Sequence, residues 1–221
     1  ENGLQVEGRP EIRKVICGVS ANLALIDAAI AEDADALVVH HGLVWRPGIQ
    51  HVRGWLARRI TRLLGAQLNL FAYHLPLDAH PTLGNNAGLA DALGLLPERK
   101  PFGRYKDQEI GVRGCLVAPT SFDDMCARIA AEIGEPVWTF GAREHVIRSI
   151  GICSGGAPEI LHDAVEQGLD LYVTGEATEW VKALAEECGV CFVAAGHHAT
   201  ERFGPQRLAL AVATTLGLEA K

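Results

Sequence analysis

Short apolar runs alternate along the chain with segments in which apolar residues recur every three or four positions, starting near Arg13. The apolar runs predict strands at 14–19, 36–40 and 69–74, and the periodic segments predict helices at 22–32, 49–65 and 84–93. Strands that alternate with helices are typical of a largely parallel sheet that is covered on both faces. We therefore expect the first part of the chain to form an α/β lobe.

The pattern is interrupted at residues 95–109, which contain two prolines, one glycine and seven charged residues. We place a lobe boundary there, with a first lobe at 1–100 and a second at 101–221. The second lobe is also α/β. Its predicted strands are 110–117, 137–140, 146–153, 171–174 and 190–194, and its predicted helices are 122–133, 158–167, 178–188 and 200–216.

A weak internal repeat links the two lobes. Residues 26–41 align without gaps on residues 161–176, at an offset of 135 positions. Both segments are predicted to contain a helix, an acidic turn and a buried strand that ends in polar groups. Two unrelated βα segments can match in this way by chance. A duplication would instead give two similar α/β lobes, with Glu176 at the position that corresponds to His41.

Composition limits the class of protein. The chain has 221 residues, of which 48% are hydrophobic and 21% charged, as expected for a globular protein. The net charge of −7 disfavours nucleic acid as a partner. No apolar run reaches the roughly 18 residues of a membrane span, so we expect no membrane association. With no secretory signal, we expect the six cysteines to be reduced and the protein to be cytoplasmic.

Polar residues with metal-binding chemistry follow four of the predicted strands. They occur in the segments His40-His41-Gly42, His74 to Asp78, Thr174-Gly175-Glu176 and His197 to Glu201. In open α/β sheets, ligands bind at the carboxyl ends of the strands, so these segments can converge. Clustered imidazoles and carboxylates without matched thiolates suit Zn, Fe, Mn or similar ions.

Each segment also has a simpler explanation. His40 and His41 can serve two neighbouring ions, or can be ordinary histidines at a strand end. His197 and Glu201 are four residues apart and share a helix face, as metal ligands or as an exposed pair. Pro76 predicts a turn that aims Asp78 inward, although an aspartate is also common in turns without any ligand.

Taken together, three histidines and two carboxylates could hold two ions. If Glu201 bridges them, each ion gains three protein ligands and keeps open positions for water, which is the pattern of catalytic sites. Two such ions can activate water and polarise a bound substrate.

These segments, with Asn85-Asn86, resemble the motifs of the GTP cyclohydrolase I type 2 family, also called the NGG-interacting-factor-like family. The resemblance extends from Asn2 to about Gly204. It implies two α/β lobes with the metal site between them and a toroidal homohexamer. It also implies a dinuclear centre, whose five ligands are His40, His41, Asp78, His197 and Glu201.

Three further features have two interpretations each. Cys188 and Cys191 have the spacing of a redox or zinc pair, but no second pair accompanies them. Four arginines on one predicted helix (Arg53, Arg58, Arg59 and Arg62) could bind phosphates, although a solvated face or a subunit contact is the simpler interpretation. The turn Ser154-Gly155-Gly156 is either a phosphate-binding turn or a plain turn.

The resulting hypothesis is a metal-dependent hydrolase with two divalent ions per chain, of Zn, Fe or Mn, and no other cofactor. Its expected substrate is a nucleotide-like or phosphorylated small molecule. Glu176 is the candidate general base or supporting carboxylate, and His74 or His198 is the candidate proton donor. The alternative is a noncatalytic, metal-organised hexameric scaffold.

Overall fold

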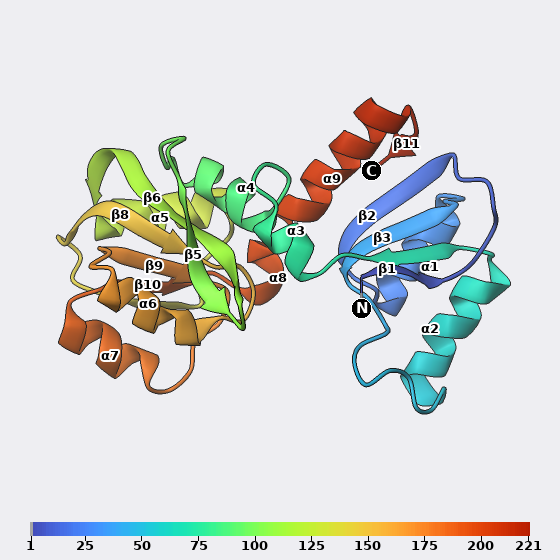
Figure 1. Cartoon of the computed structure of the whole chain (residues 1–221), viewed down its shortest axis with the longest axis horizontal. Coiled ribbons are helices and arrows are strands. Elements are labelled where there is room, and N and C mark those ends of the chain that lie inside the picture. Colours follow the sequence, from blue (N-terminus) through green and yellow to red (C-terminus); the bar gives the residue numbers. More distant parts are fainter. Residues whose placement is uncertain (1) are drawn as a thin grey trace. The chain divides into compact units, whose positions relative to one another are not determined.

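The protein is described from a computed structural model, which covers residues 2–221. The chain forms two compact units (Figure 1), the first built from residues 2–77 and 204–221 and the second from residues 78–203. The boundary predicted at residue 100 is therefore wrong. Residues 85–95 pack into the core of the second unit, and the end of the chain returns to the first unit.

The first unit contains a five-stranded sheet in the order β1-β4-β3-β2-β11. Strands β2, β3, β4 and β11 are parallel, and β1 is an antiparallel edge strand. The strands span Gly3–Val6 (β1), Lys14–Ser20 (β2), Ala36–His41 (β3), Asn69–Ala72 (β4) and Glu219–Ala220 (β11). The prediction of a largely parallel sheet is confirmed for this unit.

Two helices pack together and against this sheet, namely α1 (Leu23–Ala31) and α2 (Gly54–Gly65). Their apolar faces build the core of the first unit, where Ile26, Leu37 and Leu63 are fully buried. Helix α2 is shorter than the predicted segment 49–65, because the backbone is still extended at the residue that precedes Gly54. Polar residues stand at the carboxyl ends of β3 and β4.

One aspartate organises the start of the strands in the first unit. Asp35 precedes β3, and its Oδ2 accepts hydrogen bonds from the backbone N–H groups of Arg13 (2.7 Å) and Lys14 (2.9 Å). Its Oδ1 accepts a third bond from the Arg9 guanidinium at 2.9 Å. These donors lower the pKa of Asp35 although its burial acts in the opposite direction.

The second unit repeats this arrangement at the offset of 135 positions seen in the sequence. Asp170 precedes a strand, and its Oδ2 accepts from the backbone N–H groups of Arg148 (2.9 Å) and Ser149 (2.8 Å). The helical segment between them also corresponds, since Pro158–Ile160 (η1) and Leu161–Glu166 (α6) occupy the positions equivalent to α1. The internal repeat is thus present in the hydrogen bonds as well as in the sequence.

The second unit contains a six-stranded sheet in the order β5-β6-β8-β9-β10-β7. Only β8, β9 and β10 are parallel to one another, and the outer strands are antiparallel. The strands span Lys100–Tyr105 (β5), Gln108–Ser121 (β6), Trp138–Phe140 (β7), Val146–Ile152 (β8), Leu171–Thr174 (β9) and Cys191–Ala194 (β10). The sheet is therefore mixed rather than largely parallel, because residues 100–121 form a hairpin where a boundary was predicted.

Helices cover both faces of the second sheet. Helices α4 (Asn85–Ala92) and α5 (Phe122–Glu132) pack on the face that carries Leu171 and Val173. The alternate residue Tyr172 points to the opposite face, where it contacts the rings of neighbouring phenylalanines. Helix α6 and helix α7 (Val181–Cys188) pack on the strands of this unit as well. Strands β9 and β10 are therefore buried along their whole length.

Two short helices follow strand ends and carry candidate residues. Helix α3 (Leu75–Ala79) contains Pro76, so the prediction of a turn there is wrong. Proline is tolerated in the first turn of a helix because the N–H that it lacks would have no helical partner there. The helix predicted at 200–216 is two helices, α8 (His197–Thr200) and α9 (Phe203–Leu216). Among residues 2–221, no helix is long and apolar enough to cross a membrane.

Candidate functional site

The first unit brings three histidines together at the ends of two adjacent parallel strands. His40 and His41 are the last residues of β3, and His74 follows the neighbouring strand β4. One ring nitrogen of each lies within 4.8 Å of the others. The centroid of the His74 ring is 4.9 Å from that of His40 and 5.4 Å from that of His41. Histidines in such a group could hold a metal ion.

His40 is buried, and its orientation is set by a backbone group. Its Nδ1 lies 3.0 Å from the carbonyl oxygen of Tyr73. A carbonyl oxygen can only accept, so Nδ1 carries a proton, and in the neutral imidazole Nε2 then keeps its lone pair. Metal-binding histidines are commonly oriented in this way by a carbonyl or carboxylate. The Nδ1 of His41 lies 3.1 Å from the Ser20 hydroxyl, which belongs to the neighbouring strand β2.

The second unit brings together the carboxylates. Asp78 lies in α3 and is buried, and its Oδ1 accepts hydrogen bonds from the Ser154 hydroxyl (2.8 Å) and the Asn85 side chain (2.9 Å). A carboxylate oxygen of Asp78 lies within 4.8 Å of one of Glu201, which is also buried. Two buried carboxylates this close repel each other, and a cation relieves that repulsion.

His197 is held between two carboxylates. Its Nδ1 is 2.6 Å from Glu176 Oε1, and its Nε2 is 3.2 Å from Glu201 Oε1. Glu201 and then Glu176 raise the pKa of His197 to about 9, although partial burial opposes the shift. The imidazole therefore carries a proton at neutral pH, which shows that the surrounding charges favour a cation at this position.

The turn predicted either to bind phosphate or to be a plain turn lies against these groups. The Ser154 backbone N–H donates to Asn86, and the Gly155 N–H donates to the Thr200 hydroxyl. A Cβ at Gly155 would overlap the Glu201 carboxylate, and one at Gly156 would lie 2.9 Å from a carboxylate oxygen of Glu176. The N–H groups of Ser154 and Gly155 therefore bond inside the unit, and the turn packs against the carboxylates.

Sequence reasoning missed Ser20 and Tyr73, which position the candidate ligands His41 and His40. It noticed Ser154 only as part of a turn, and not its hydrogen bond to Asp78. These bonds join residues far apart along the chain. Asn85 and Asn86 were noticed only as a motif. Asn86 joins the backbone oxygen of Ile110 to the Ser154 N–H, at 2.7 and 2.8 Å. Two adjacent asparagines at the start of a predicted helix were the one local sign in the sequence of such a supporting role.

The other candidates lie apart from these groups. His198 is exposed, although it follows His197. Cys188 is exposed at the end of α7, whereas Cys191 is buried in β10. The two cysteines therefore lie in different elements and in different environments. On α2, the Arg59 guanidinium lies over the Trp55 ring at 4.8 Å, and Arg62 pairs with an aspartate of α1.

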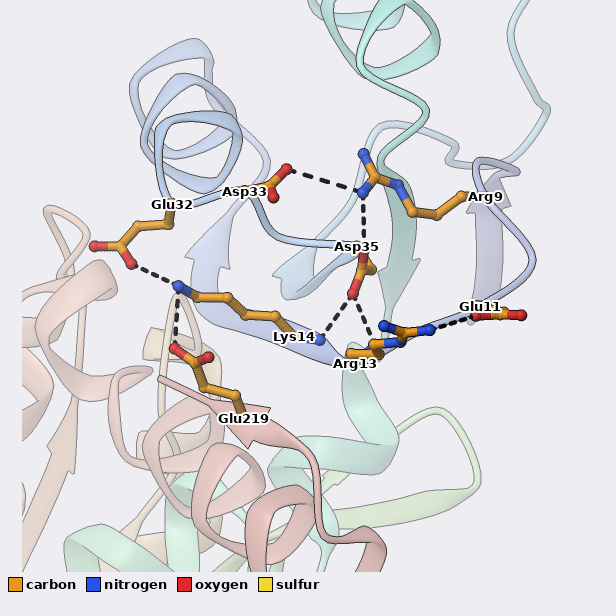
Figure 2. Close-up of a pocket in the computed structure, with 8 residues that line it drawn as sticks. All are labelled: Arg9, Glu11, Arg13, Lys14, Glu32, Asp33, Asp35 and Glu219. Atoms are coloured by element: carbon orange, nitrogen blue, oxygen red, sulfur yellow. Dashed lines mark hydrogen bonds and ion pairs between the residues drawn. The ribbon is translucent and has the colours of Figure 1, made fainter.

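A charged pocket lies at the opposite, amino ends of the strands in the first unit (Figure 2). The Lys14 ammonium contacts Glu32 at 2.9 Å and Glu219 at 3.0 Å, and Arg9 contacts Asp35 at 2.9 Å. These opposite charges neutralise one another. The pocket therefore has the character of an ion-pair network that joins the start of β2 to its neighbours.

The donor atoms fit divalent metal ions. Imidazole nitrogens suit Zn and Fe, and carboxylates also accept Mn. His40 is oriented through Nδ1 by a backbone carbonyl. His197 faces Glu176 through Nδ1 and Glu201 through Nε2. Within the first unit these donors are His40, His41 and His74. Within the second unit they are Asp78, His197 and Glu201, and Glu176 contacts His197.

The chain is similar to known proteins over its full length. The model of the family Duf34/NIF3 (NGG1p interacting factor 3) matches residues 1–220. A relative from Neisseria meningitidis serogroup A, named GTP cyclohydrolase 1 type 2 homolog, is 44% identical over 218 residues, which is 99% of this chain and 86% of the relative.

Solved structures agree with this similarity. The structure of protein ybgI, named as a protein of unknown function, has a TM-score of 0.90 at 37% identity and covers 100% of this chain and 87% of its own. A protein from Thermus thermophilus, TTHA1606, has a TM-score of 0.86 at 32% identity and covers 99% and 86%. The α/β fold predicted from the sequence is confirmed, and the chain belongs to the Duf34/NIF3 family.

Proposed function

We propose that this chain is a metal-dependent hydrolase that acts on a nucleotide-like or phosphorylated small molecule. Its ligands for two divalent ions are His40, His41, Asp78, His197 and Glu201. The observation that carries the proposal is that His40, grouped with His41 and His74, is oriented through Nδ1 by a backbone carbonyl, which is the arrangement of metal-binding histidines. The name that the relatives carry, GTP cyclohydrolase 1 type 2 homolog, supports the substrate class.

The proposed chemistry is hydrolytic. Divalent ions lower the pKa of water and polarise substrate oxygens. Tyr73 and Ser20 orient His40 and His41, and Asn85 and Ser154 hold one oxygen of Asp78.

Two further residues have proposed roles beside the ligands. His74 lies 4.9 Å from the His40 ring and is the favoured proton donor, because His198 is exposed. Glu176 bonds His197 at 2.6 Å, so we assign it the role of orienting that imidazole rather than of general base. We further propose a homohexamer in the cytoplasm, with no nucleic-acid partner, from the family resemblance.

Metal content tests the ligand set. We expect two ions per chain in wild-type protein by elemental analysis. Glu201→Ala should lower the occupancy of both, whereas Asp78→Ala should mainly remove one. Asp107→Ala, at a fully exposed carboxylate, is the matched control and should keep both. At most one ion in metal-replete wild type would contradict the dinuclear proposal.

Glu176→Gln tests the orienting role. Because the amide is neutral, the imidazole loses a charged partner, and we expect metal affinity or turnover to fall by about 10- to 100-fold. Glu179→Gln, at an exposed neighbour, should leave both unchanged. An unchanged affinity and rate in Glu176→Gln would refute this role.

Turnover and mass separate the enzyme from the scaffold. Metal-replete protein should hydrolyse a member of a nucleotide panel, and His41→Ala should abolish this while the fold survives. Light scattering should give about six times the chain mass of 23.7 kDa. If wild type turns over nothing and His41→Ala dissociates the assembly, the noncatalytic scaffold replaces the hydrolase.

A further inference from the structure

An indole ring stands beside the histidines of the first unit. Trp45 lies edge-to-face against His74, with ring centroids 4.9 Å apart, and its centroid is 6.2 Å from that of His41. The residue is nevertheless 37% exposed. A large apolar ring that is in contact with candidate ligands on one side and open on another can stack on a planar molecule.

The position of this ring is fixed by its own segment. The indole N–H of Trp45 donates to the carbonyl oxygen of Gly42 at 3.1 Å. The two residues before Trp45 are clamped to β1, because Gln5 Oε1 accepts from the backbone N–H groups of Leu43 (2.7 Å) and Val44 (3.0 Å), and its side-chain amide donates back to Val44.

Gly42 makes the clamp possible. A Cβ at this position would overlap the Gln5 side chain and would lie 2.7 Å from the Cβ of Ala72. Only glycine therefore allows the chain to leave β3 so close to β1. Trp45 is pre-organised in this way, and a ligand that stacks on it does not have to order the ring.

The charge of the segment indicates which planar molecules fit. Between Gly42 and Gly65 the sequence contains five arginines and no Asp or Glu, in a chain whose net charge is −7. Arg46 follows Trp45 directly. A ligand with a planar ring and a negative charge matches both properties, which is the chemistry of a nucleotide.

We propose that Trp45 is the stacking platform for the planar base of an anionic, nucleotide-like ligand. The proposal deepens the proposed function, on which its ligand class rests. It concerns binding, so it can be tested without turnover.

The test measures binding of GMP and of ribose 5-phosphate, which lacks the base, to the full metal-replete chain by calorimetry. Trp45→Ala should weaken the binding of GMP by about tenfold or more, as expected for the loss of one stacking contact. It should leave the affinity for ribose 5-phosphate within about twofold, because this probe has no base to stack on the ring. Trp45→Phe should retain most of the affinity for GMP.

Trp55→Ala is the matched control, since Trp55 is also exposed in the first unit but lies on α2. It should bind GMP as wild type does, and elemental analysis should show unchanged metal in all variants. The proposal is overturned if Trp45→Ala binds GMP as tightly as wild type does, if both probes weaken equally, or if wild type shows no preference for GMP over ribose 5-phosphate. If binding depends on the base but no substrate is turned over, the hydrolase proposal is contradicted and the stacking role of Trp45 is supported.

Discussion

Gly155 has no Cβ, and the space that a Cβ would fill is taken by the Glu201 carboxylate. The residue also has a φ of +69°, a conformation that side chains other than glycine rarely adopt. Close approach and positive φ thus both require glycine here. A single residue without a side chain lets the turn after β8 reach the candidate metal ligands.

Substitution of this glycine gives a prediction with a matched control. Gly155→Ala should lower the free energy of unfolding by the cost of positive φ, about 1–2 kcal/mol, plus about 1–3 kcal/mol for overlap with Glu201. It should also lower metal content. Gly168 has a φ of +62° and nothing near its missing Cβ, so Gly168→Ala should show only the cost of positive φ. The metal content of this variant should be unchanged. Equal unfolding free energies and equal metal content for the two variants, measured by urea titration and elemental analysis, would contradict this.

At the scale of elements, the same aspartate arrangement starts a strand in each unit. Asp35 and Asp170 each accept two backbone N–H groups from the preceding strand or from the residue just before it. Such a contact aligns the start of a strand with the strand that precedes it in the chain, after the intervening helix. The shared bonds explain why both aspartates occur at equivalent positions of the repeat.

Asp35→Asn should destabilise the protein by about 1–3 kcal/mol, because backbone donors lose a charged acceptor. The pKa of Asp35 is lowered in the folded state, so its stabilisation is present above its ordinary value of 3.8 and is lost as pH falls below it. The difference between wild type and variant should therefore shrink in acid. Urea titrations at several pH values measure it.

Asp33→Asn is the control, since the Asp33 side chain is 93% exposed. It should change stability by less than about 0.5 kcal/mol. A gap between wild type and Asp35→Asn that stays constant down to a pH of about 2 would mean that this carboxylate does not stabilise the fold through its charge.

For the whole molecule, the division of the chain decides which fragment can fold alone. The apolar core of the second unit is built entirely from residues of 78–203. The fragment 78–203 should therefore unfold cooperatively in urea and give dispersed amide NMR signals. The fragment 101–221 lacks Leu89 and Leu93, which are fully buried in that core, and should remain unfolded. Folding of both fragments, or of neither, would refute the observed boundary.

The sequence by itself determined the central strands, most of the helices and the candidate ligands. Apolar runs such as 36–39 are local signals of burial, and His40 and His41 interrupt that run where a strand must end. The positions of Asp78, His197 and Glu201 followed in the same way, from polar residues placed just after strands. The family was also recognisable from these short segments.

Only the tertiary structure decided the rest. The hairpin of β5 and β6 looked like a linker, because prolines and charges are also compatible with an exposed edge strand. The boundary at residue 78 depends on which core Leu89 joins, and the support of Asp78 by Ser154 joins residues 76 positions apart. Such choices depend on free energies of packing and pairing between distant residues, and local patterns do not contain them.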